Sequence, residues 1–410
     1  MKKYLLFLLV SSFLFAQTPN VKPGIDVLQK NNFRELKGKK VGLITNPTGV
    51  NSKLISTIDI LAASDEFELV ALYGPEHGVR GDYAAGDYVE NYIDQKTKLP
   101  VYSLYGKTRK PTKEMLKGVD VLVFDIQDIG CRSYTYISTM GVAMEAAAEN
   151  DIEFVVLDRP NPLGGNKIEG NLAEDGFISF ISQFKIPYVH GLTVGELAKL
   201  LNGEGMLGKG AKCKLAVVPM EGWKRGMSFE KTGLEWIPTS PHVPYKETPA
   251  YYVATGVLGE LGVISEGVGY TIPFQVYAAE WIDAPLMAEK MNELKLDGII
   301  FRPIVFKPFY GKNTGKQLSG VQLHITDFEK VNLMELQFRF LEVHHKLYPD
   351  KNPFELCDKS RIGMFDKASG TSKIRELLSK SFNFSDVKDY LEKDTENFRN
   401  VSKKYYLYGN

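Results

Sequence analysis

The stretch "VDVLVFDIQ" (residues 119–127) contains an apolar run, 121–124, that is followed directly by Asp125. A short apolar run of this kind is typical of a strand buried on both faces of a parallel sheet. Four other runs share this character, each followed by a polar or glycine-rich turn: 39–46, 67–74, 153–160 and 213–220. Segments with helical spacing of apolar residues lie between the runs, at 54–64, 135–150 and 193–204. This alternation predicts an α/β fold with a doubly wound, mainly parallel sheet and helices on both faces.

The second half of the chain has a different texture. The segment "EWIPTSPHVPYKETPAYY" (235–252) is too rich in proline for a long helix, and we interpret it as an interdomain segment that lines a cleft. Beyond it, the patterns predict strands at 298–309 and 320–327, a helix at 333–349 and mainly helices in the last fifty residues. A chain of 410 residues is long enough for two domains. We therefore expect a first domain at 21–243 and a smaller α+β domain at 244–410 that completes the cleft.

Composition excludes several classes of protein. The chain has 50 basic and 50 acidic side chains, so no global attraction to nucleic acid or to an anionic membrane is expected, and an anionic substrate must be held by a few local arginines. Three cysteines (Cys131, Cys213 and Cys357) and six scattered histidines give no disulfide framework and no metal-binding spacing. No glycine-rich nucleotide motif is present either. We expect no metal and no cofactor, and the sequence leaves the oligomeric state open.

The amino terminus has the pattern of an export signal. Lys2 and Lys3 precede an apolar stretch, and Ala16 offers a small residue for cleavage. The stretch is too short and too early for a transmembrane helix. Residues 1–16 are therefore predicted to be a signal peptide, and the mature chain is expected to be exported without an integral membrane segment, to the periplasm or, alternatively, to the medium.

Chemically rich loops follow three of the predicted strands. In an open parallel sheet, ligands bind beyond the carboxyl ends of the strands, where such loops meet. Each of the three loops begins with a carboxylate or contains one close to the strand end. The candidate residues are Glu76, His77, Asp125, Asp128, Arg132, Tyr134, Asp158, Arg159 and Asn161.

Structural roles compete with functional roles at several of these positions. Asp158 and Arg159 stand before a proline turn, where such residues are common, and Asp125 could cap the following helix. Glu169 could belong to a turn or to the site. Glu76 and His77 lie between glycines, and glutamate is neither a turn former nor a typical helix cap, so a function is the better explanation there.

The carboxylates favour one reaction class. No G-x-S-x-G motif is present, which argues against a serine hydrolase. Cleavage of a glycosidic bond needs an acid that protonates the departing oxygen and a group that stabilises the sugar cation, and carboxyl groups do both. Burial or neighbouring carboxylates could keep Glu76 protonated.

The motifs together resemble a known family. "GLITNPTGV", "YGPEHGVRGD", "VLVFDIQDIGCRSYTYISTM", "VLDRPNPLGG" and "HGLTVGELA" are similar, in order, to motifs of the exo-β-N-acetylmuramidase (NamZ/YbbC-like) family, over nearly all of residues 38–245. The resemblance implies a Rossmann-like domain, a smaller carboxy-terminal domain and an active site in the cleft between them. It also implies removal of N-acetylmuramic acid from the non-reducing end of a peptidoglycan-derived sugar or muropeptide.

The resemblance assigns roles residue by residue. The G-P-E-H-G motif implies that Glu76 is the general acid, with His77 beside it as an orienting or substrate-binding group. Asp125 or Asp128 would be the base or nucleophile, unless the acetamido group of the substrate attacks and an aspartate orients it. Arginines are expected because the lactyl carboxylate of N-acetylmuramic acid can be held bidentately. The residues implied to bind substrate are His77, Arg80, Gln127, Arg132, Tyr134, Asp158, Arg159, Asn161, Glu169 and Glu266.

One region departs from the family pattern. In "YYVATGVLGELGVISEGVGYTIPF" (251–274), Val253 replaces an expected proline and Tyr270 an expected arginine, while Glu266 and Gly267 remain. Loss of polar residues from a cleft wall could change the substrate. The sequence therefore predicts an exo-acting glycosidase, with two alternatives: a non-catalytic muropeptide- or glycan-binding protein of the same fold, and a metal- or phosphate-dependent hydrolase that uses the aspartates.

Overall fold

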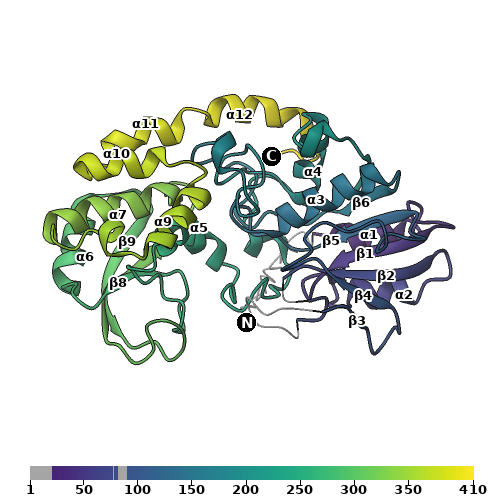
Figure 1. Cartoon of the computed structure of the whole chain (residues 1–410), viewed down its shortest axis with the longest axis horizontal. Helices are drawn as coiled ribbons and strands as arrows, with labels where there is room; N and C mark the ends of the chain where they lie inside the picture. Colours follow the sequence, from purple (N-terminus) through teal and green to yellow (C-terminus); the bar gives the residue numbers. More distant parts are fainter. Residues whose placement is uncertain (1–20, 77, 82–89) are drawn as a thin grey trace, which may run out of the picture.

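The computed structural model describes residues 21–76, 78–81 and 90–410 (Figure 1). The predicted signal peptide and His77 lie outside these residues. Within the described part of the chain, no helix combines the length and the apolar character needed to cross a membrane.

A seven-stranded sheet forms the first domain, in the order β3-β4-β2-β1-β5-β6-β7. All neighbouring strands are parallel except the β3/β4 pair. The strands are β1 (Lys40–Thr45), β2 (Glu68–Gly74), β3 (Tyr92–Ile93), β4 (Pro100–Ser103), β5 (Val121–Asp125), β6 (Glu153–Leu157) and β7 (Lys214–Val218). The doubly wound fold and its five apolar strands are confirmed. The two short strands β3 and β4 were not predicted.

Different helices cover the two faces of this sheet. Side chains alternate along a strand, so Leu43 and Val123 face one side while Ile44 and Phe124 face the other. The first pair packs with α1 and α2, and the second pair packs with α3 and α4. These helices are α1 (Gly24–Lys30), α2 (Thr57–Ala62), α3 (Tyr136–Glu149) and α4 (Val194–Gly203). The sheet is therefore buried on both sides, and only its ends are open to a ligand.

The second domain is built on a three-stranded antiparallel sheet in the order β8-β10-β9. Its elements are β8 (Val276–Ala279), β9 (Ile299–Phe306), β10 (Leu318–Ile325), α5 (Thr248–Gly259), α6 (Ala284–Glu293) and α7 (Leu333–Leu347). The predicted smaller α+β domain is confirmed, including both predicted strands and the helix at 333–349. The helix α5 was not predicted, because it begins inside the proline-rich segment, where Pro249 occupies its first turn.

The chain ends with a series of helices that leads back to the first domain. They are α8 (Pro353–Leu356), α9 (Lys359–Ser369), α10 (Lys373–Ser381), α11 (Ser385–Glu392) and α12 (Thr395–Ser402). Figure 1 shows α12 crossing from the second domain to the first, with the C-terminus near α4. One hydrophobic core also runs through both domains, since Cys131 and Tyr188 share it with Val253 and Phe340. The boundary predicted at 243/244 stays a prediction, but the last residues lie against the first domain.

Candidate active site

The order of the strands locates the open end where a ligand fits. From β1, the chain first adds β2 and β4 on one side of the sheet. It then returns to the other side of β1, where β5, β6 and β7 follow one another. Ligands of open α/β sheets bind beyond the carboxyl ends of the strands at such a reversal. The loops after β1 and β5 meet there, because Thr45 pairs with Asp125 and the Thr48 hydroxyl accepts the N–H of Gln127 at 2.9 Å.

Glu76 lies just beyond the carboxyl end of β2, where it is partly buried. Tyr105, which follows β4, is hydrogen-bonded to its carboxyl group, and burial together with the charge of Glu76 raises the pKa of Tyr105 to about 12. The hydroxyl of Tyr136 is also near Glu76: burial raises its pKa well above the usual value, and the Glu76 charge adds to the effect. Glu76 is therefore held beside two tyrosine hydroxyls.

Asp128 is almost fully buried in the loop after β5. One carboxylate oxygen accepts the N–H of Gly130 at 2.7 Å, whereas the other, Oδ1, is buried and has no hydrogen-bond partner among the described residues. Burial raises the pKa of Asp128 to about 7. A carboxyl group that exchanges its proton near neutral pH is suited to acid–base chemistry, and its second oxygen is available to a ligand.

Two tyrosines connect these carboxyl groups. The rings of Tyr134 and Tyr136 meet edge to face at 5.0 Å between centroids. Burial raises the pKa of Tyr134, and the nearby charge of Asp128 contributes. The two hydroxyls bond to Thr239, one to its hydroxyl at 2.8 Å and the other to its carbonyl oxygen at 2.5 Å. Glu76 thus adjoins Tyr136, Asp128 adjoins Tyr134, and the interdomain segment packs over the pair.

Asn46 is a polar residue of this site that the sequence did not single out. Its Oδ1 accepts the N–H of Thr48 at 3.0 Å, and its side chain is also a hydrogen-bonding neighbour of the Tyr136 hydroxyl. Asn46 directly follows the apolar run of β1. The rule that ligands bind beyond strand ends, applied to this strand as well, would have found it.

Asp125 does not fit the predicted role of base or nucleophile. It is fully buried, and both of its oxygens are bonded: Oδ1 to Arg159 Nε at 2.6 Å, and Oδ2 to Arg159 Nη2 at 2.9 Å and to the Thr57 hydroxyl at 2.5 Å. Neither oxygen is available to a substrate. The arrangement favours a positioning role in which Asp125 holds the guanidinium of Arg159.

Of the arginines predicted to bind an anion, Arg159 is the one whose surroundings best allow it to do so. It lines a hollow together with Thr48, Asn51, Gln127 and Phe229. Its Nε and Nη2 are engaged with Asp125 and with the carbonyl of Val50, whereas Nη1 donates to no other described residue. Gln127 is fixed beside it by bonds from its Nε2 to the carbonyls of Asp128 and Pro160, at 2.7 and 2.8 Å.

The surroundings of Arg132 do not fit its predicted role in substrate binding. The side chain is fully buried, and all five of its N–H donors are used within the protein. Nε donates to the Ser182 hydroxyl, and the four remaining donors reach backbone carbonyls of Asn171, Ile186, Ala368 and Ser369, over 2.6–3.2 Å. Because the first two carbonyls belong to the first domain and the last two to α9, Arg132 joins the domains.

Arg80 is engaged at the edge of the sheet. It forms a bidentate pair with Asp94, at 2.6 and 3.1 Å, and a longer contact with Asp59 at 3.4 Å. The bond to Arg80 is the main cause that lowers the pKa of Asp94. The contacts describe a structural ion pair rather than an anion-binding side chain.

The predicted substrate-binding role of Asp158 does not fit its surroundings. It is fully buried; Oδ2 accepts hydroxyl hydrogens from Thr193 at 2.7 Å and from Tyr408 at 2.5 Å, and Oδ1 accepts the N–H of Gly195 at 2.8 Å. Burial raises its pKa to about 6. Asp158 therefore anchors the start of α4 and the C-terminal tail.

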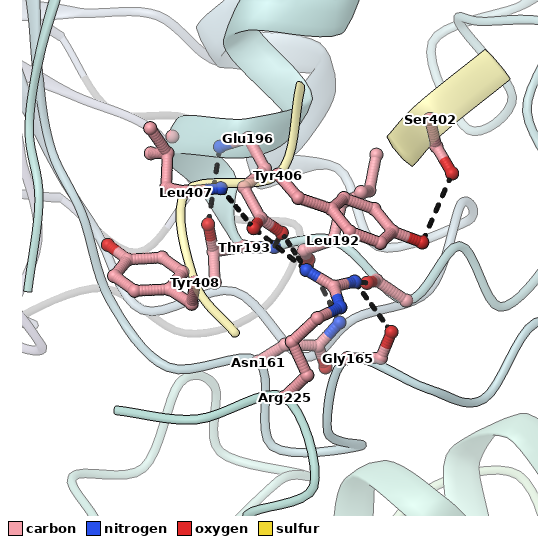
Figure 2. A network of polar contacts seen from close by, with 12 residues as sticks. Asn161, Gly165, Leu192, Thr193, Glu196, Arg225, Ser402, Tyr406, Leu407 and Tyr408 are labelled. Atoms are coloured by element: carbon pink, nitrogen blue, oxygen red, sulfur yellow. Dashed lines mark hydrogen bonds and ion pairs between the residues drawn. The ribbon is translucent and has the colours of Figure 1, made fainter. Parts of the chain in front are cut away.

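A second buried network beside Asp158 holds the same tail. Figure 2 shows Arg225 bonded to Glu196 and to the carbonyl of Gly165. The N–H of Leu407 donates to Glu196 at 2.9 Å, and the ring of Tyr406 lies 3.4 Å from the guanidinium carbon of Arg225. The end of the chain is thus part of the first domain's structure.

Three further candidates are also engaged outside the site. Asn161 donates to the carbonyl of Leu192 and accepts the N–H of Leu163, both at 2.9 Å. Glu169 pairs with Lys167 at 3.2 Å and accepts the N–H of Met334 at 2.9 Å, which links the domains. Glu266 lies in the second domain, where burial and the neighbouring Glu260 raise its pKa to about 7. These contacts give Asn161 and Glu169 structural roles and do not bring Glu266 to the carboxylates at the sheet end.

No group of three or more histidine, cysteine, aspartate or glutamate side chains among the described residues is arranged to hold a metal ion. The polar groups that meet at the sheet end are instead two carboxyl groups, an amide and tyrosine hydroxyls. This set can transfer a proton to and from a neutral substrate.

The burial of Asp128 has a measurable consequence for stability. The folded pKa is about 7, whereas an unfolded aspartate titrates near 3.9, so between these values the folded state keeps a proton that the unfolded state loses. Stability conferred by that proton is lost as pH rises. The side chain of the Asp128→Asn variant stays neutral at every pH. As pH rises from 5 to 8, the free energy of unfolding of this variant, measured with urea, should increase by on the order of 2 kcal/mol relative to that of the wild type. Asp175→Asn, at an exposed aspartate, is the control; equal pH dependence of all three proteins would contradict the assignment.

Comparisons with known proteins identify the family of the chain. The family description "Exo-beta-N-acetylmuramidase NamZ" matches the chain twice, with its N-terminal part over residues 41–247 and its C-terminal part over residues 250–408. The peptidoglycan beta-N-acetylmuramidase NamZ of Bacillus subtilis (strain 168) is 47% identical over 393 residues, which are 96% of this chain and 92% of that protein. The second match includes the region that departs from the expected motif.

Two crystal structures from Bacteroides fragilis NCTC 9343 have the same fold. Both are of DUF1343 family proteins. One is 60% identical with a TM-score of 0.92, and the other is 28% identical with a TM-score of 0.75. Each comparison covers 95% of this chain and 99% of the other.

Proposed function

Since the chain belongs to the exo-β-N-acetylmuramidase NamZ family and is a glycosidase, we propose that it removes N-acetylmuramic acid from the non-reducing ends of peptidoglycan fragments. The observation that supports this most directly is the pair of carboxyl groups at the sheet end. Glu76 adjoins Tyr136 and Asp128 adjoins Tyr134, and the two environments differ. Two carboxyl groups in unlike surroundings are the usual equipment for glycoside hydrolysis.

Glu76 acts as the general acid. It gives a proton to the glycosidic oxygen while the bond from that oxygen to the anomeric carbon breaks and its electron pair stays on the oxygen. The hydrogen bond from Tyr105 fixes the direction of the carboxyl group, and partial burial limits the access of water. His77, whose place lies outside the described residues, keeps its predicted role as a neighbouring substrate-binding group.

Asp128 is the second catalytic group. Its unpartnered Oδ1 can accept one N–H or O–H, either from the acetamido group of the sugar or from an attacking water. Asp125 has no such oxygen, which supports Asp128 in its place. The anomer first formed, observed by NMR, separates the mechanisms: retention indicates acetamido or carboxylate attack, and inversion indicates direct attack by water.

Arg159 is the group best suited to recognise the lactyl carboxylate, which distinguishes N-acetylmuramic acid from N-acetylglucosamine. It lines a hollow near the carboxyl ends of β1, β5 and β6, and Asp125 holds its guanidinium in place. A preoriented guanidinium loses little conformational freedom on binding a carboxylate.

The test compares two chromogenic substrates with purified residues 17–410. We expect release of nitrophenol from the nitrophenyl β-glycoside of N-acetylmuramic acid and at least about a hundredfold lower kcat/KM for the N-acetylglucosamine analogue, since a buried charge pair contributes several kcal/mol. Arg159→Lys should reduce the ratio between the kcat/KM values of the two substrates. Binding of the muramide without turnover would support the glycan-binding alternative, and equal rates on both sugars would contradict recognition of the lactyl group.

We also propose that residues 1–16 direct export and that the mature enzyme acts in the periplasm. Cell fractionation with an antibody tests this. Recovery in the periplasm of a chain shortened at the amino terminus is expected, recovery in the medium would support secretion, and recovery of the full-length chain in the cytoplasm would contradict export.

A further inference from the structure

Two large aromatic side chains are exposed side by side in the turn that follows β9. Phe309 is 63% exposed and Tyr310 is 41% exposed, and their ring centroids are 5.4 Å apart. Single exposed apolar side chains are ordinary, whereas adjacent large aromatic rings are typical of a binding surface. The first question is whether the turn is firmly held.

Backbone contacts fix this turn against the preceding part of the domain. The N–H of Phe309 donates to the carbonyl of Gly269 at 2.9 Å, and the N–H of Gly315 donates to the carbonyl of Pro308 at 2.9 Å. A Cβ atom at Gly269 would lie 2.3 Å from the carbonyl oxygen of Tyr310, so only glycine allows this approach, and its φ of +99° also requires glycine. The aromatic side chains are therefore presented by a preorganised backbone.

The ring of Tyr310 is stacked with that of His242. The centroids are 5.9 Å apart and the ring planes differ by 13°. His242 belongs to the interdomain segment and Tyr310 to the second domain, so this stacked pair joins the two parts of the chain. We call this pair the aromatic platform.

His242, one ring of the platform, is close along the chain to a residue of the candidate active site. His242 lies three residues after Thr239, which bonds to both Tyr134 and Tyr136. Three residues of extended chain span at most about 11 Å, so the Cα atom of His242 lies within about that distance of the Cα atom of Thr239, to which both tyrosine hydroxyls bond. A substrate longer than one sugar would extend from the buried carboxyl groups toward it.

We propose that Tyr310 and His242 bind the sugar that follows the scissile bond, which is the N-acetylglucosamine residue of a peptidoglycan fragment. This inference rests on the proposed function. The C–H face of a pyranose is apolar and flat, and an aromatic ring with a polar edge can pack against it while contacting the surrounding hydroxyl groups. The platform thereby favours a glycan over a small leaving group.

Calorimetric titration tests the platform in a Glu76→Gln background, which keeps the ligand intact. Tyr310→Ala should weaken binding of the disaccharide N-acetylmuramyl-N-acetylglucosamine by about tenfold and change binding of N-acetylmuramic acid alone by less than about twofold. Ile300→Ala is the control, because Ile300 is an exposed apolar side chain of β9 (54% exposed) with no ring contact to Tyr310. It should change neither affinity by more than about twofold.

Two results would contradict the proposed role of the platform. One is an unchanged affinity of Tyr310→Ala for the disaccharide, and the other is an equal loss of affinity for the disaccharide and for N-acetylmuramic acid. Failure of the proposed function is distinguishable from this. If the unmodified protein hydrolyses no muramide but Tyr310→Ala still loses affinity for the disaccharide alone, the platform holds and the glycosidase assignment to this sugar fails. If hydrolysis occurs and Tyr310→Ala binds the disaccharide like its parent, only the platform fails.

Discussion

Replacement of Glu76 by glutamine is expected to lower kcat/KM for the disaccharide N-acetylmuramyl-N-acetylglucosamine by at least about a hundredfold, because an amide cannot give a proton to the departing oxygen. Glutamine has the shape of glutamate and can still accept the hydrogen bond from Tyr105. The affinity for the disaccharide should therefore change little. Steady-state kinetics and calorimetric titration of the variant measure these two effects separately.

A second substrate distinguishes an acid from a residue that only supports the site. A dinitrophenyl leaving group departs without a proton, so Glu76→Gln should lose much less activity on the dinitrophenyl muramide than on the disaccharide. Tyr105→Phe, which removes the hydrogen bond but leaves the acid, is the control and should lose about tenfold or less on either substrate. Equal losses of Glu76→Gln on both substrates would contradict the assignment.

Replacement of Arg132 by alanine is expected to lower the free energy of unfolding by about 3–5 kcal/mol, measured by urea denaturation. The substitution removes the Arg132 donor from four buried carbonyl oxygens and a hydroxyl, of which only the Ser369 carbonyl keeps a second donor, Asn171 Nδ2 at 3.0 Å; an unsatisfied buried acceptor costs about 1–3 kcal/mol.

The same substitution should also loosen the contact between the domains, because Arg132 joins carbonyls of both. We expect the urea transition to broaden or to separate into two steps. Arg34→Ala, which removes a side chain that is 78% exposed, is the control and should cost less than about 1 kcal/mol. A loss for Arg132→Ala no larger than that of the control would contradict the structural role.

The fold was largely predictable because its strands are continuous apolar runs. A strand that is buried on both faces is apolar at every position, so it can be recognised without an alternation of polar and apolar residues. The sequence therefore predicts all five such strands: β1, β2, β5, β6 and β7. The strands β3, β4 and β8 have only two to four residues and lack such a run. The order of the strands, which locates the site, is a tertiary property that no single run contains.

The candidate site was predictable only in part, because a charged residue in a loop does not reveal its partner. Asp125 and Arg132 lie at or after the same strand, β5, as Asp128 and Tyr134, and Asp158 follows the neighbouring β6. Distant groups nevertheless occupy their side chains, including carbonyls more than 230 residues away in the case of Arg132. Burial of a charge requires such partners. Tyr105 and Thr239 were missed for the converse reason, since only the folded chain brings them to the carboxyl groups.

The most direct test of the proposed activity uses a tetrasaccharide of alternating N-acetylmuramic acid and N-acetylglucosamine, with N-acetylmuramic acid at the non-reducing end. Products of the purified enzyme are followed over time by mass spectrometry. The structure and the family predict one equivalent of free N-acetylmuramic acid and a trisaccharide that begins with N-acetylglucosamine and is not degraded further. Release of disaccharides from within the chain, or recovery of the intact tetrasaccharide, would contradict an exo-acting muramidase.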